Sequence, residues 1–254
     1  MATCPTIFSV LSVLLAIGAA QERDERPSEP AAIAFYTELV DKRVYNLDQA
    51  GAAHLEAGFD LVVSDPGKPT VRIGGRTTFD YATRASATTV DPVHAQDPTA
   101  AARLEISIQI AHMLRWSSDR SDHVLSFRTE GTDFVIDLEP RDRTLGIVRK
   151  TQHFRQDGLP LRETVLLRDE ATGKEGRLES VFEFTELDGK TLLSRQTTDS
   201  SSGLRQVVDL EYQQTDSFWT LKRLVHRIHT MTTTIDFLKV RVQRRKESGL
   251  PGAR

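Results

Sequence analysis

Histidine spacing offers a first test for metal-binding chemistry in this sequence. His226 and His229 form an H-x-x-H pair, a spacing that on a helix would bring both imidazole rings to one side. The surrounding residues are instead typical of a β-strand, in which positions i and i+3 face opposite ways. The other histidines show no ligand spacing: His54, His94, His112, His123 and His153. We therefore predict no metal site and no cofactor.

Carboxylates and serines are the next residues that could do chemistry. Asp133 and Asp137 lie at even spacing on one predicted strand, which is typical of a solvated strand face, whereas a glycosidase needs two carboxylates from different elements. Serines 200–202 lie in a predicted turn with no histidine nearby in sequence. Gly74-Gly75 lacks the following helix of a phosphate loop and indicates a bend or bulge. Because we find no catalytic motif, we predict a non-enzymatic protein; a hydrolase triad assembled in space is a third hypothesis.

Apolar side chains on predicted strands and on one predicted helix are more informative. They have two interpretations, an ordinary packed core or the lining of an apolar cleft between a sheet and its covering helices. The candidate ligand-binding residues are Leu104, Ile108, Phe127, Phe134, Phe182, Phe184, Tyr212 and Trp219.

The chain after residue 123 is predicted to be all strand, joined by short turns. The predicted strands are 124–127, 134–138, 145–154, 161–167, 178–187, 191–197, 204–212, 218–228 and 233–242. Asp157-Gly158 and Asp188-Gly189 are the strongest hairpin signals, because type I′ turns need two residues that tolerate positive φ. So many strands with short connections predict an antiparallel meander that must curl.

Alternation on the strand 178–187 indicates which face is buried. Leu178, Phe182 and Phe184 share one face, opposite Glu179 and Glu183. This pattern predicts one dry and one wet face of the sheet.

Two helices are predicted before the meander. Residues 31–45 carry apolar side chains at helical spacing. Asp97-Pro98 is a typical helix start, and a wide apolar stripe extends from it as far as residue 116. Between these helices, alternation over 55–63 predicts a strand, and 71–73 and 76–81 predict one or two more.

The N-terminal segment predicts export. Residues 7–20 form an uncharged apolar run that is short for a membrane span, and Gly18-Ala19-Ala20 is typical of a signal-peptide cleavage site. No Lys or Arg precedes the run, and a buried N-terminal helix is the alternative. With cleavage after Ala20, Cys4 is removed and no thiol is left for disulfides or catalysis. We expect a periplasmic or secreted protein with no stable membrane span after signal removal.

Composition and charge exclude some partners. The chain has 254 residues and a net charge of −3, which gives no electrostatic field for steering nucleic acid or anionic lipid. We predict a signal peptide at 1–20, a flexible linker at 21–30, a single domain at 31–243 and a disordered tail at 244–254.

The order of these elements resembles the periplasmic lipoprotein-carrier (LolA/LolB-like) superfamily. The segment 157–165, DGLPLRETV, resembles the recurring "D-G-x-P" strand start of that superfamily, and 207–212 and 237–242 resemble its late strands. The resemblance extends as a pattern over most of 31–243. It implies a half-open barrel with helices over an apolar cavity. The ligand-gating arginine of the carriers has no matching position in this sequence.

These observations predict an α+β fold, a long curled antiparallel sheet (half-open barrel) covered by two helices. We expect an exported, non-enzymatic carrier for an apolar ligand, with a lipid or an acylated protein as partner. The alternative is an envelope protein–protein interaction module with a fully packed core.

Overall fold

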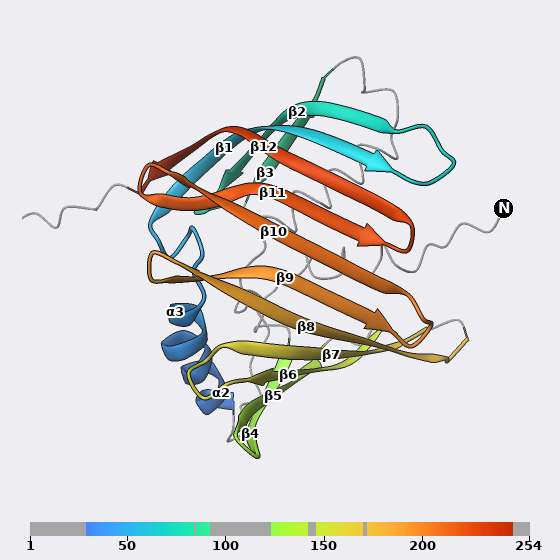
Figure 1. Ribbon diagram of the computed structural model, residues 1–254. Helices are drawn as coiled ribbons and strands as arrows, with labels where there is room; N and C mark the ends of the chain where they lie inside the picture. The colour runs from blue at the N-terminus through green and yellow to red at the C-terminus, as the bar shows by residue number, and fades with distance from the viewer. Residues whose placement is uncertain (1–28, 84, 92–122, 142–145, 170–171, 246–254) are drawn as a thin grey trace, which may run out of the picture. The chain divides into compact units, whose positions relative to one another are not determined.

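The computed structural model describes residues 29–83, 85–91, 123–141, 146–169 and 172–245 (Figure 1). The predicted signal peptide and the second predicted helix, with Leu104 and Ile108, lie outside the described residues. Two predicted boundaries are wrong by a few residues. Glu29 and Pro30, assigned to the linker, begin a helix, and Arg244, assigned to the tail, ends the last strand.

One continuous helical segment precedes the first strand. It consists of α2 (Glu29–Phe35), the π-helical turn η1 (Tyr36–Val40) and α3 (Asp41–Arg43). A proline in the first turn suits the N-terminus of a helix, since its missing N–H would have no helical acceptor there. The segment ends where Val44 turns to an extended conformation. Within the described residues, no helix has the length and hydrophobicity that crossing a lipid bilayer requires.

The strands form an open antiparallel sheet. They are β1 (Ala52–Ser64), β2 (Val71–Asp80), β3 (Ser86–Val90), β4 (His123–Glu130), β5 (Asp133–Pro140), β6 (Ile147–Phe154), β7 (Pro160–Arg168), β8 (Glu175–Leu187), β9 (Lys190–Ser200), β10 (Arg205–Thr215), β11 (Phe218–Ile228) and β12 (Met231–Arg244). The order is β3-β2-β1-β12-β11-β10-β9-β8-β7-β6-β5-β4, and β3 and β4 end the twelve-stranded sheet. The predicted meander after residue 123 is confirmed strand by strand.

The chain divides into two compact units. The first holds the helical segment up to Tyr45 and the strands from β4 to Val208. The second holds β1 to β3, from Asn46 on, and the strands from Asp209 on. Each unit is therefore built from segments that are distant in sequence.

The sequence predicted a bend or bulge at Gly74-Gly75, but both residues continue strand β2. β1 and β2 pair without a register shift, and Gly75 lies directly opposite Phe59. A Cβ on Gly75 would lie 2.6 Å from the Phe59 ring and would collide with the Thr89 carbonyl oxygen. The predicted bulge is wrong, because the glycine instead allows an aromatic ring and a neighbouring strand to approach the backbone closely.

The two strongest turn signals differ in conformation. Asp188 and Gly189 both have positive φ, which confirms a type I′ turn. At the other site only Gly158 has positive φ, while the N–H of Arg155 donates to the carbonyl of Leu159 at 2.8 Å. The turn was predicted correctly, but its predicted type was wrong.

Candidate ligand-binding face

One face of strands β4 to β9 in the first unit carries the helical segment. Side chains of directly paired residues point to the same side of a sheet, so the strand register defines this face. We call it the helix-side face. From β4 to β9 its members include Leu125, Phe127, Phe134, Ile136, Leu138, Lys150, Gln152, Phe154, Glu163, Val165, Leu178, Ser180, Phe182, Phe184, Leu193, Gln196 and Thr198.

An aromatic cluster fills the helix-side face beneath α2. The ring of Phe35 lies 5.4 Å from Phe127, 5.1 Å from Phe134 and 5.3 Å from Phe154 between centroids. The ring of Tyr36 meets Phe154 edge-on at 5.7 Å. Offset and edge-on pairs of this kind stabilise a packed core. Two candidate ligand residues, Phe127 and Phe134, therefore lie together, and side chains of the protein itself pack against them.

Phe182 and Phe184 continue the same face on β8. Phe182 is 9% exposed and Phe184 is half-buried. On β9, the register with β8 shifts by one residue at Ser194, so Leu193 comes to lie opposite Phe184. The bulge keeps an apolar side chain beside Phe184 on the helix-side face.

Tyr212 and Trp219 belong to the second unit. Both are half-buried, Tyr212 on β10 and Trp219 on β11. Burial raises the pKa of the Tyr212 hydroxyl. The structure thus divides the predicted ligand-binding residues between the two units, and only those of the first unit are members of the helix-side face.

Polar side chains also belong to the helix-side face. The buried hydroxyl of Tyr36 donates to Gln152, and the Gln152 amide donates to Glu163 at 2.5 Å. On the next strands, the hydroxyls of Ser180 and Thr198 share a hydrogen bond of 2.8 Å. The face predicted to be dry therefore also holds polar side chains, and hydrogen bonding allows these to be buried among the apolar ones.

A buried ion pair joins the start of α2 to the end of β5. Arg141 donates to Glu29 at 3.1 Å, and their side chains are 17% and 3% exposed. The second carboxylate oxygen of Glu29 and the Nε of Arg141 are buried, and neither has a hydrogen-bond partner among the described residues. Removing either residue would leave an uncompensated buried charge, so this pair fixes the helix start to the sheet.

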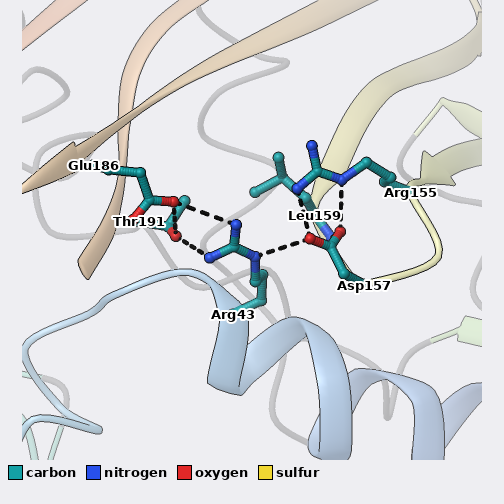
Figure 2. A network of polar contacts seen from close by, with 6 residues as sticks. All are labelled: Arg43, Arg155, Asp157, Leu159, Glu186 and Thr191. Carbon is teal, nitrogen blue, oxygen red and sulfur yellow. Dashed lines mark hydrogen bonds and ion pairs between the residues drawn. The ribbon is translucent and has the colours of Figure 1, made fainter. Parts of the chain in front are cut away.

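The end of the helical segment is held by the Arg43 network (Figure 2). The Arg43 guanidinium contacts Asp157 at 3.2 Å and Glu186 at 3.3 Å, and it donates to the hydroxyl of Thr191. Arg155 in turn donates twice to Asp157, at 2.8 and 2.5 Å. One arginine therefore connects the helix to two separate hairpin turns of the sheet.

The π-helical turn sets the direction of Arg43. The N–H of Asp41 donates to the carbonyl of Tyr36, five residues back. One extra residue in a turn rotates the rest of the helix by about 100° relative to a continuous α-helix. With this rotation, Tyr36 and Val40 remain fully buried while Arg43 reaches the turns at Asp157 and Thr191.

Two features of the 155–159 turn favour the docked helix. The hydrogen bonds from Arg155, and then from the Leu159 backbone and Arg43, lower the pKa of Asp157, so its carboxylate stays ionised. Gly158 has a φ of +84°, and a Cβ there would lie 2.8 Å from the Cβ of Leu39 and 3.0 Å from the backbone N of Val40. The glycine lets the helix and the turn touch.

Metal chemistry finds no support among the histidines and acids that the structure describes. No group of three or more metal-ligating side chains occurs within the described ranges. His226 lies in β11 and burial lowers its pKa, whereas His229 comes after the strand with a φ of +51°. These two rings lie in different backbone environments and not as a pair on one helix.

The chain is similar to several proteins of known structure. No family model matches the chain, and no curated protein matches it significantly. The chain is similar to a DUF1329 family protein from Desulfovibrio piger (TM-score 0.37, 11% identity, covering 86% of this chain and 94% of that one). It is also similar to a LolA superfamily protein from Nitrosomonas europaea (TM-score 0.35, 8% identity, 86% and 94% covered). A third is a domain described as that of an outer membrane lipoprotein-sorting protein from Vibrio parahaemolyticus (TM-score 0.36, 10% identity, 85% and 94% covered). One of these three solved structures is thus described as a LolA superfamily protein.

Sequence reasoning missed the residues that hold the helical segment in place. Arg43, Glu29 and Arg141 carry no local pattern that sets them apart from other surface charges. Their partners lie more than a hundred residues away in the chain. Of these contacts, the sequence indicated only the two turns that Arg43 reaches, at Asp157-Gly158 and Asp188-Gly189.

Proposed function

We propose that this chain is an exported, non-enzymatic protein that binds an apolar ligand, such as a lipid or the acyl chain of a lipoprotein, against the helix-side face. One observation carries the proposal. Phe127, Phe134 and Phe184 are only half-buried on a face that a helical segment already covers in part. Partly covered aromatic surface beside a packed cluster is typical of a site that gains stability when an apolar ligand covers the rest.

The polar anchors of the helical segment support this proposal. The Glu29–Arg141 pair holds one end of the segment and the Arg43 network holds the other. A cover fixed by two ion-pair clusters, with aromatic rings between them, keeps the helical segment at a constant distance from the aromatic residues of the sheet. A preorganised surface of this kind lowers the entropic cost of binding.

The first test is the lipid content of the protein as purified from an exporting host. Native mass spectrometry should find a bound lipid, and an environment-sensitive apolar dye should bind to the delipidated protein and be displaced by added lipid. Protein that is repeatedly empty and binds no dye would refute the proposal.

Two substitutions on β8 locate the site. Phe184 belongs to the helix-side face, whereas the neighbouring Val181 is 52% exposed on the opposite face. We expect Phe184→Ala to weaken dye binding by about tenfold, since a buried aromatic contact contributes about 1.5–3 kcal/mol and only part of this ring is available. The matched control Val181→Ala should bind as the wild type does. Equal affinities of the two variants would place the dye elsewhere.

A second candidate function is an envelope protein–protein interaction module. The close packing of Phe35 against three other rings favours it, because this part of the helix-side face is already filled by the protein. Empty protein without dye binding is the result expected for this candidate.

A further inference from the structure

A single lysine interrupts an apolar row on the helix-side face. Lys150 of β6 lies directly between Leu138 of β5 and Val165 of β7, with Leu125 and Leu178 next in the row on either side. All four neighbours are aliphatic. A cation in the middle of an aliphatic row is unfavourable unless an anion compensates it.

Lys150 is buried without an ionic partner among the described residues. The residue is 8% exposed, and its Nζ is not one of the buried polar atoms that lack a hydrogen-bond partner, so the stem of the lysine is buried while its ammonium group keeps contact with solvent. No hydrogen bond or ion pair joins it to another of the described residues, where an ion pair would bring an acidic oxygen within 4.0 Å. The ammonium is therefore accessible at the surface of an otherwise aliphatic row, and it has no counterion from the described part of the protein.

The carboxylates of this region are engaged elsewhere. Glu163 is diagonal to Lys150 on the neighbouring strand, and it accepts a hydrogen bond from Gln152 at 2.5 Å. Glu29 of the helical segment is paired with Arg141 at 3.1 Å. Each acid thus has one oxygen that accepts a hydrogen bond from a residue other than Lys150, and neither forms an ion pair with the lysine.

We propose that the ligand of the helix-side face is an anionic amphiphile, whose head-group oxygens bind the Lys150 ammonium and whose apolar chain lies over Val165, Leu178 and the β8 phenylalanines. This inference rests on the proposed function and adds the charge of the ligand to it. A carboxylate and a phosphate monoester share the required chemistry, since each offers charged oxygen acceptors to an ammonium donor. A neutral ligand of the same chain length would leave the lysine unpaired.

The test compares a charged with an uncharged ligand of the same chain. The delipidated full-length protein is titrated at neutral pH with cis-parinaric acid and with its methyl ester, and binding is followed by fluorescence. We expect the acid to bind about tenfold more tightly than the ester, because only the acid offers charged oxygen acceptors to the ammonium group. Displacement of the acid by a monoacyl glycerol phosphate or by a saturated fatty acid then shows which head group is preferred.

Three variants assign the effect to one side chain. Lys150→Met retains an apolar stem and should remove the preference for the acid, while Lys190→Met, at an exposed position on β9, should retain it. Glu163→Gln keeps an acceptor for Gln152 but removes a nearby negative charge, so it should strengthen binding of the acid and leave the ester unchanged. Misfolding would weaken the binding of both ligands. It therefore does not explain opposite effects of the substitutions at positions 150 and 163 on the binding of the acid.

Two outcomes of the titration with acid and ester would overturn different claims. Wild-type protein that binds acid and ester equally would overturn the inference on charge and leave the proposed apolar site intact. Protein that binds neither ligand would overturn the proposed function itself.

Discussion

Gly158 provides the most direct test of how the helical segment is held. Replacement by alanine has two costs, since the residue has a φ of +84° and a Cβ would press against Leu39 and Val40 at 2.8 to 3.0 Å. The conformational cost for an L-residue with positive φ is about 1–2 kcal/mol. Overpacking adds about 1–3 kcal/mol. We expect Gly158→Ala to lower the free energy of unfolding by about 2–5 kcal/mol in total.

Gly189 offers a matched control in the same unit. It also comes after an aspartate in a hairpin turn and has a φ of +69°, but no atom lies within 4 Å of the position of its Cβ. Gly189→Ala should therefore cost only the conformational part, about 1–2 kcal/mol. The difference between the two variants measures the contact between helix and turn.

Urea denaturation monitored by circular dichroism gives both free energies. Hydrogen exchange adds a local readout, because only Gly158→Ala should speed exchange of the amides from Tyr36 to Val44, by about tenfold for each 1.4 kcal/mol of lost protection. Equal losses of stability in the two variants, or unchanged exchange of the helical amides, would refute the close approach of the helix to this turn.

Three further substitutions test other contacts of the helical segment by the same unfolding measurement. Phe35→Ala should lower the free energy of unfolding by about 3–5 kcal/mol, because it removes the ring on which the aromatic cluster is built; a loss under about 1 kcal/mol would contradict that packing. Tyr36→Phe should cost about 1 kcal/mol, since it leaves Gln152 without its buried donor, and an unchanged stability would argue against this bond. Asp157→Asn should cost about 0.5–1 kcal/mol, as expected for a partly exposed ion pair. Because the folded-state pKa of Asp157 is lowered, this difference should be complete above the ordinary aspartate pKa of about 3.9 and be lost gradually as the pH falls from there towards the lowered folded-state pKa; a difference that does not decrease at all below about pH 3.9 would contradict the assignment.

The sequence predicted the elements of this protein well, for a local physical reason. Side chains alternate across a strand and recur at helical spacing along a helix, so β4 to β12 and the helical segment are visible in the order of apolar residues alone. The Asp188-Gly189 turn was equally clear, because the need for positive φ is a property of the residues themselves.

The tertiary structure decided which of these residues meet. Phe35 packs on rings from three different strands, and Arg43 reaches acids more than a hundred positions away, at distances that no local pattern encodes. The position of Lys150 in an aliphatic row likewise depends on the register of β5, β6 and β7. Local chemistry thus fixed the strands and turns, whereas pairing across the sheet determined that a charged side chain would be buried among apolar ones.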